Sequence, residues 1–242
     1  MSSARVLCGS LLAGLALPVA MMVAICARAA ECGPTGVPSP FIAHYDVKAS
    51  RGVFSLDGEA TLEFKRSGND YTLTNSMNAA GLLSSRQESF GALGDGIMIP
   101  VRYVESSSRR AAAHTVIDWR ERRVTFADGS HAQVRATLQD RASVVLQAAL
   151  ALRARPDATV LEYPVVSLRR VSLWHFERRE TERLDTSIGS IEAVRFERID
   201  ADGGDRLDVW LAPTHCGVPI RIRLHDHRGL QVDQRVRDVR FD

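Results

Sequence analysis

Signatures of nucleotide binding and of nucleophilic catalysis are missing from this sequence. Its paired glycines connect one predicted strand to the next, so none of them opens a helix as a phosphate-binding loop does. There is no Gly-x-Ser-x-Gly segment, and no cysteine and histidine lie in a context typical of a catalytic pair. The sequence therefore predicts no cofactor and favours a protein that is not an enzyme, with a hydrolase as an alternative.

An excess of positive charge is also absent. The 31 Lys and Arg exceed the 29 Asp and Glu by only two, and Lys48 and Lys65 are the only lysines. Arg5 and Arg28 lie in a segment that we expect to be removed, which leaves 29 basic against 29 acidic residues. A neutral chain has no net charge to attract nucleic acid or an anionic membrane surface. We therefore expect no nucleic-acid partner.

Long apolar runs are absent except near the start. Arg5 precedes an apolar stretch from Val6 to Ile25, and the small residues of Ala27-Arg28-Ala29 stand where a signal peptidase cleaves. This pattern predicts a signal peptide over residues 1–29 and a mature protein in the periplasm. Bulky Ile25 before Cys26 argues against a lipid-modified cysteine. An N-terminus retained as a membrane anchor is the alternative.

Cysteine is scarce, and only Cys32 and Cys216 follow the predicted cleavage site. An oxidising compartment permits a disulfide, and free thiols are unusual in exported proteins. A bond between Cys32 and Cys216 would tie the N-terminal tail to the loop before the last strands. Two unpaired thiols are the alternative.

The mature chain divides into a short linker and one large domain. Residues 30–40 are rich in glycine and proline without a regular pattern, which is typical of a linker. Over residues 41–242, apolar and polar side chains alternate in short segments separated by turns. This meander predicts a single, mainly β domain, an antiparallel open barrel or strongly curved sheet. The predicted strands are residues 41–47, 60–65, 71–74, 87–93, 97–105, 113–118, 123–126, 161–167, 171–180, 191–199, 206–212, 220–224 and 230–241.

One segment departs from the alternation. Residues 140–153 place apolar side chains at helical spacing, are rich in alanine and contain neither glycine nor proline. Asp140 can cap the helix by accepting backbone N–H bonds. Because the helix is apolar over most of its circumference, we expect the sheet to enclose it.

The predicted strands carry more apolar side chains than one helix can cover. A curved sheet wrapped around a helix can leave an apolar cleft, which is a natural site for an acyl chain. An ordinary packed core is the alternative interpretation. The predicted ligand-binding residues are Tyr45, Phe64, Tyr103, Leu146 and Leu150.

The segment His225-Asp226-His227 is the candidate metal site. At a strand end His225 and His227 point to the same face, and Asp233 or His215 could supply a third ligand. We favour the alternative, a polar hairpin turn with solvated histidines, so no metal site is predicted.

Arginines cluster at residues 109–110, 120–123, 169–170 and 178–179, beside acidic residues. Cross-strand ion pairs on solvated outer faces explain these clusters. A site for an anionic head group is the alternative.

Several short motifs follow one another in a recognisable order along the chain. They are Tyr45-x-Val47, Gly58-x-Ala60, Tyr71-x-Leu73, Pro100-x-x-Tyr103, Gln139-Asp140-x-x-Ser143, Thr186-Ser187-Ile188-Gly189, Trp210-Leu211-Ala212 and Pro219-Ile220-Arg221. Their order resembles a family of bacterial exported proteins, the domain-of-unknown-function family 3108. The resemblance covers residues 41–242 and implies a curved antiparallel sheet around a helix, similar in outline to periplasmic lipoprotein carriers of the LolA/LolB type. It implies no catalytic residues.

These features favour a non-enzymatic periplasmic binding or carrier protein for an apolar cell-envelope ligand, such as a lipid or acyl chain. One alternative is an envelope hydrolase or metal-dependent enzyme that uses His225, His227 and nearby carboxylates. Another is a scaffold that recruits an envelope protein partner through an exposed strand edge.

Overall fold

Fifteen strands form one open sheet in the computed structural model, which describes residues 39–134, 137–199 and 205–242. The spatial order is β8-β7-β6-β5-β4-β3-β2-β1-β15-β14-β13-β12-β11-β10-β9, and neighbours are antiparallel except for β9 and β10. The elements are β1 (Phe41–Arg51), β2 (Phe54–Ser67), β3 (Asp70–Ala79), β4 (Leu83–Gly94), β5 (Ile97–Ser107), β6 (Arg110–Asp118), β7 (Arg123–Thr125), β8 (His131–Gln133), β9 (Gln139–Asp140), α1 (Ser143–Ala154), β10 (Val160–Val166), β11 (Val171–Thr186), β12 (Gly189–Ile199), β13 (Arg206–Leu211), the 3-10 turn η1 (Pro213–His215), β14 (Pro219–His225) and β15 (Leu230–Phe241).

The first and last strands pair in the middle of the sheet. β1 lies along β15 from Phe41 opposite Phe241 to Arg51 opposite Leu230. The strands from β1 to β8 continue outward on one side of this pair, and those from β15 back to β9 continue on the other. The sheet therefore has an N-terminal half and a C-terminal half, joined where the two ends of the domain meet.

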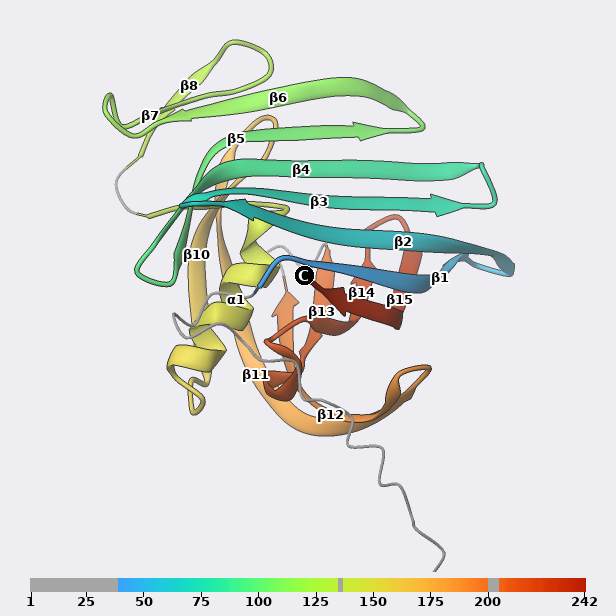
Figure 1. The fold of residues 1–242 in the computed structure, drawn as a ribbon. Coiled ribbons are helices and arrows are strands. Elements are labelled where there is room, and N and C mark those ends of the chain that lie inside the picture. Colours follow the sequence, from blue (N-terminus) through green and yellow to red (C-terminus); the bar gives the residue numbers. More distant parts are fainter. Residues whose placement is uncertain (1–38, 135–136, 200–204) are drawn as a thin grey trace, which may run out of the picture.

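The sheet curls until its two halves face each other across α1. In Figure 1, β1–β6 form an upper layer and β10–β12 sweep down and beneath it, with α1 held between them. The helix contacts β5 from the N-terminal half and β10 and β14 from the C-terminal half. A strongly curved, mainly antiparallel sheet around one helix was the predicted fold class, and the described residues confirm it.

Most predicted elements are confirmed, with differences at their ends. The helix begins at Ser143 rather than at residue 140, because Asp140 closes the short strand β9. The N-cap residue is Ala142 rather than Asp140, but Asp140 accepts backbone N–H bonds at the helix start as predicted, since its Oδ1 binds the N–H groups of Ala142 at 2.9 Å and Ser143 at 2.8 Å. Strands β8 and β9 were not predicted, whereas β7, which is as short as β8, was predicted as residues 123–126.

The predicted signal peptide, most of the linker and Cys32 lie outside the described residues. Cys216 is fully buried and disulfide-bonded. Its pairing with Cys32 stays a prediction, with an expected result: the intact mass of the exported protein should be two hydrogens below the fully reduced mass. After Cys32→Ser substitution the remaining thiol should react with a maleimide under denaturing conditions. An unshifted mass for the unsubstituted protein would contradict the bond.

Candidate functional site

A cavity of about 240 Å³ lies between the two halves of the sheet, beside the first turn of α1. Side chains from both halves and from the helix line it, so it exists only because the sheet curls. Its apolar wall includes Leu62, Leu73, Val145, Leu146, Ile222 and Leu224. Its polar wall includes Arg141, Arg170, Ser172, Arg198, Asp205 and Gln234.

Strand alternation and pairing decide which side chains face this cavity. Arg198 on β12 stands opposite Leu207 on β13, and both line the cavity. The next pair along, Glu197 opposite Asp208, therefore points to the outer face of the sheet. Of the two arginines on β12, Arg198 is in this way turned toward the cavity, while Arg195 pairs with Asp208 on the outer face.

The start of α1 is held against the cavity by a buried polar network. Tyr71 and Ser89 share a hydrogen bond of 2.8 Å, and the Ser89 hydroxyl donates to Oδ2 of Asp140 at 2.5 Å. Burial raises the pKa of Asp140 to about 6, although its hydrogen bonds with Ser89, Ser143 and Ala142 each lower that pKa. Ser89 and Asp140 have no exposed surface, so this network positions the helix and offers no attacking group to a substrate.

Two glutamine side chains add to this attachment. Gln139 donates from Nε2 to the carbonyl oxygen of Met98 at 2.8 Å, and Gln147 accepts the Met98 N–H at 2.7 Å. One residue of β5 is thus bound from β9 and from α1 at once. The helix cannot shift along β5 without losing the bond from Gln147.

The structure separates the five predicted ligand-binding residues. Leu146 lines the cavity, whereas Tyr45, Phe64, Tyr103 and Leu150 are packed away from it. The Tyr45 hydroxyl donates to the carbonyl oxygen of Pro219 at 2.9 Å, and the Tyr103 hydroxyl donates to Glu105 at 2.6 Å.

Phe64 and Leu150 belong to the packed core. The Phe64 ring packs between those of Phe41 and Tyr71, with centroids 5.9 and 6.3 Å away. Leu150 follows Leu146 by one helical turn and is buried in the main core cluster. An inward-facing apolar side chain meets either the core or the cavity, and only the spacing between the layers decides which.

The predicted His225-Asp226-His227 site is a hairpin turn at the end of β14. Asp226 accepts the N–H groups of Arg228 and Leu230, both at 2.8 Å, which closes the turn. His227 contacts Asp205, one of the residues that line the cavity. Within the described ranges, no group of three or more His, Cys, Asp or Glu side chains is placed to hold a metal ion.

The third ligands considered for that site have other partners. Asp233 forms two hydrogen bonds with Arg221, at 2.7 and 2.5 Å. The His215 ring lies 3.0 Å from the Thr214 hydroxyl on η1. Neither Asp233 nor His215 is brought to His225 and His227 as a third ligand.

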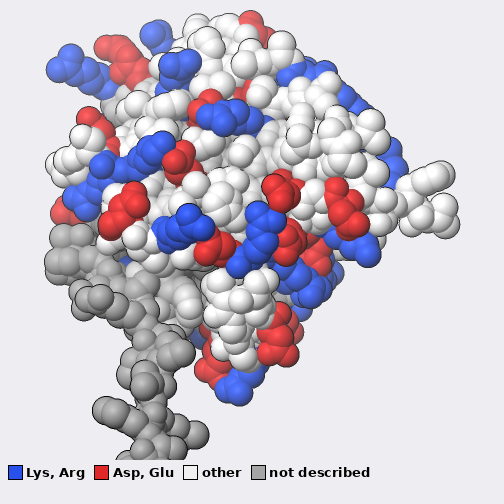
Figure 2. All heavy atoms as spheres, turned by 45° about the vertical axis from the view of Figure 1, so that its right-hand side comes forward, with Lys and Arg blue, Asp and Glu red and all other residues white. Residues whose placement is uncertain are grey.

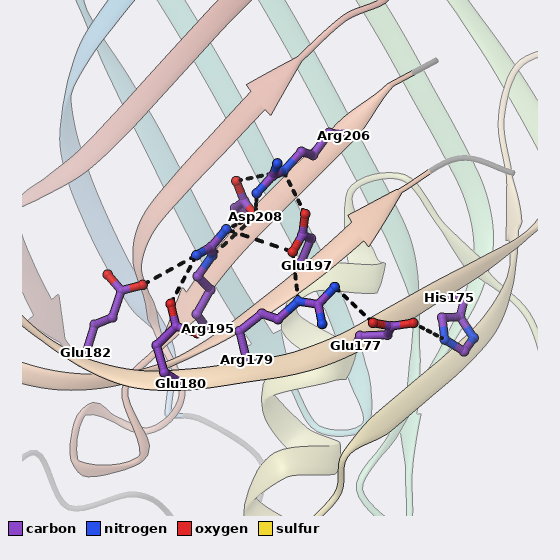
Figure 3. A network of polar contacts seen from close by, with 9 residues as sticks. All are labelled: His175, Glu177, Arg179, Glu180, Glu182, Arg195, Glu197, Arg206 and Asp208. Atoms are coloured by element: carbon purple, nitrogen blue, oxygen red, sulfur yellow. Dashed lines mark hydrogen bonds and ion pairs between the residues drawn. The ribbon is translucent and has the colours of Figure 1, made fainter. Parts of the chain in front are cut away.

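A network of ion pairs covers the outer face of β11–β13 (Figure 3). Glu197 binds Arg179 at 2.7 Å and Arg206 at 2.9 Å, and Arg195 reaches the buried Asp208 at 3.1 Å. These pairs lie on the face opposite the cavity. The cross-strand pairing predicted for the arginine clusters is confirmed here for Arg179.

Charges of both signs are interspersed on one face of the molecule. On the face drawn in Figure 2, Lys and Arg residues alternate with Asp and Glu residues, without a continuous field of one sign. This arrangement agrees with the balanced composition.

Sequence reasoning missed Arg141, Arg198 and Trp174 as cavity residues. Arg141 follows Asp140 just ahead of the helix, and Arg198 directly follows the charged residue Glu197 in β12, so neither residue stands out in the sequence. Trp174 lies with its ring 4.0 Å below the guanidinium carbon of Arg198. The one sequence signal for this polar wall was Arg170, because the arginine pair at residues 169–170 belongs to the clusters for which an anionic head-group site was the alternative interpretation.

Comparisons with known proteins agree with this architecture. The model of one family, described as protein of unknown function (DUF3108), matches residues 44–233, so the chain belongs to that family. A β-barrel-like protein of domain of unknown function DUF1849 from Brucella abortus has the same fold. It is 12% identical with a TM-score of 0.57, and the match covers 84% of this chain and 98% of that one. No curated protein matches the sequence.

Two further solved structures match over a similar share of the chain. One is a domain provisionally assigned to outer membrane lipoprotein sorting, from Vibrio parahaemolyticus, with 12% identity, 84% and 86% coverage and a TM-score of 0.23. The other is a DUF1329 family protein from Desulfovibrio piger, with 11% identity, 84% and 86% coverage and a TM-score of 0.24. Scores this low carry no argument about function.

Among the described residues, no helix has the length and apolar character that crossing a membrane requires.

Proposed function

We propose that this member of the DUF3108 family is a non-enzymatic binding or carrier protein of the periplasm, with an apolar ligand such as a lipid or acyl chain. The cavity between the two halves of the sheet is the observation that carries this proposal. Its volume of about 240 Å³ is close to the lower end of ligand pockets, which begin at roughly 300 Å³. Export rests on the signal-peptide pattern of residues 1–29.

The walls of the cavity suit an apolar chain. Leu62 and Leu73 come from one layer, Ile222 and Leu224 from the other, and Leu146 closes the side next to the helix. Burying apolar surface contributes about 25 cal/mol per Å², so a flexible chain gains affinity along its length. Of the five predicted ligand-binding residues, the proposal retains Leu146.

Neither alternative function gains a site among the described residues. The rings of four histidines hydrogen-bond to Thr61, Glu162, Thr214 and Asp205, and the buried Ser89 hydroxyl is bound to Asp140. For a scaffold, the edge strands β8 and β9 are only three and two residues long. Short edges offer few backbone groups for pairing with a partner strand.

Native mass spectrometry of the protein, exported from the full-length chain and purified without detergent, tests the proposal. We expect a fraction of molecules to carry an added mass that matches a lipid or fatty acid. Added dodecanol at about 100 times its dissociation constant should raise the midpoint of thermal unfolding by about 5–10 °C. No added mass and no thermal shift with any amphiphile would overturn the proposal.

Filling the cavity should abolish binding. Val145 on α1 lines the cavity and is only partly buried, so Val145→Trp adds bulk from the helix side without adding charge. We expect the dodecanol-induced shift to disappear, while overpacking lowers stability by about 1–3 kcal/mol.

Val160→Trp is the matched control, because Val160 is 43% exposed on β10 and does not line the cavity. This variant should keep the full thermal shift. Equal shifts in both variants would place the ligand elsewhere.

A further inference from the structure

Three arginines converge on the cavity from three separate elements. Arg141 precedes α1, Arg170 lies in the turn between β10 and β11, and Arg198 comes from β12. Asp205 is the one acidic residue among the described side chains that line the cavity. Among the described residues of the lining, three positive charges therefore stand against one negative charge, in a protein whose overall composition is balanced.

The arginines are close enough to act on one another. Burial lowers the pKa of Arg198 to about 10, the charges of Arg141 and Arg170 lower it as well, and Asp205 raises it. Like charges gathered in a partly desolvated site repel, and an anion placed among them removes that cost.

Arg141 provides an independent observation. Its Nε atom is buried and has no hydrogen-bond partner among the described residues. A buried donor without a partner costs free energy of about 1–3 kcal/mol, so such groups call for a reason. Here the donor belongs to a side chain that lines a cavity, next to other cationic side chains.

The guanidinium group suits a specific ligand chemistry. Its planar fork of N–H donors matches the two oxygens of a carboxylate or phosphate. Trp174 supports the cluster from below, because its ring lies against Arg198 and limits the directions in which that side chain can turn. Ser172, also in the lining, adds a hydroxyl donor.

We propose that the cavity binds a single-chain amphiphile whose anionic head, a carboxylate or a phosphate, is held by Arg141, Arg170 and Arg198. The apolar tail lies along Leu62, Leu146 and Ile222. This inference rests on the proposed function and narrows its ligand from any apolar molecule to an anionic one. A neutral or cationic head supplies no negative charge to the three arginines.

Calorimetric titration with four ligands of equal chain length tests this inference, each kept below its micelle concentration. The probes are dodecanoate, dodecyl phosphate, 1-dodecanol and dodecylamine. We expect at least one anion to bind tenfold or more tightly than dodecanol, equivalent to about 1.4 kcal/mol, and dodecylamine to bind most weakly. The anion that binds more tightly shows whether the head group is a carboxylate or a phosphate.

Arginine variants connect this preference to the cluster. Arg170→Gln and Arg141→Gln should each weaken binding of the preferred anion by about tenfold and leave dodecanol within twofold. Arg155→Gln is the matched control, since Arg155 is exposed at the far end of α1 and does not line the cavity. That variant should bind every probe as the unsubstituted protein does.

The outcomes separate the two proposals. If dodecanol binds as tightly as the anions, or if the Arg170 and Arg141 variants keep the anion preference, the anionic-head inference fails and the carrier proposal stands. If none of the four probes binds, both fail. Tight binding of dodecylamine would also overturn the inference, because it would assign a cationic ligand to a cationic site.

Discussion

As the pH rises from 3.5 to 7, the Asp140→Asn variant is expected to gain stability relative to the unsubstituted protein. The difference in the free energy of unfolding between the two proteins should shift by about 3 kcal/mol in favour of the variant, because a pKa displacement of one unit corresponds to 1.36 kcal/mol. Denaturant unfolding followed by tryptophan fluorescence at several pH values measures it.

The sign follows from the direction of the pKa shift. Burial raises the pKa of Asp140 from 3.8 to about 6 in the folded protein. Between these values the folded state holds a proton that the unfolded state has released, so stability falls as the pH rises. The contribution of the protonated group is fully present below pH 3.8 and is lost as the pH passes through 6. Asparagine cannot ionise and shows no such loss.

Asp128→Asn is the control for this experiment. Asp128 is fully exposed in a turn, and its hydrogen bonds to the Ser130 hydroxyl and N–H lower the pKa of the carboxyl. Its contribution to stability is therefore present above the unfolded pKa and is lost as the pH falls, which is the opposite sign. A stability difference for Asp140→Asn that stays flat with pH would contradict the buried, raised-pKa carboxyl.

Gly91→Ala should destabilise the protein by about 3 kcal/mol or prevent folding. A Cβ atom at Gly91 on β4 would stand 2.2 Å from the carbonyl oxygen of Ile99 and 2.7 Å from the Cα of Pro100. Both atoms belong to the backbone of β5, and the pairing register shifts at this point. The two strands would have to separate, because no side-chain rotation relieves the contact.

The consequence extends to the cavity, since β4 and β5 hold the start of α1. Ser89 on β4 binds Asp140, and Met98 on β5 binds Gln139 and Gln147. Separation of the strands should weaken dodecanol binding and should also lower the free energy of unfolding. Ligand titration and denaturant unfolding of the same variant measure both effects.

Gly94→Ala is the matched control in the same strand. Its added Cβ meets only the Cδ1 atom of Ile99 at 3.3 Å, the end of a flexible side chain. We expect a change below about 1 kcal/mol. Similar losses in both variants would show that the two glycines are sensitive to side-chain bulk in general, and that the close backbone approach at Gly91 has no special effect.

The sequence alone predicted the elements of the fold. Alternation with period two is a local property, so strands from β1 to β15 were recognised wherever they were long enough to show it. The helix was recognised from its spacing and alanine content, and Asp140 was identified as an acceptor for backbone N–H groups at its start. The exact start at Ser143 was missed, because the pairing of β9 with β10 depends on residues 165–166, far along the chain.

The candidate site was largely beyond prediction. Leu146 and Leu150 are the same residue type and lie on the same face of the helix, one turn apart. Of these two, only Leu146 lines the cavity. Arg198 resembles its outward neighbours in sequence, and its inward direction follows from its register opposite Leu207. Local sequence determines which way a side chain alternates. The tertiary structure alone decides what that side chain meets, because the distance between two curved layers is set by contacts between residues that lie far apart along the chain.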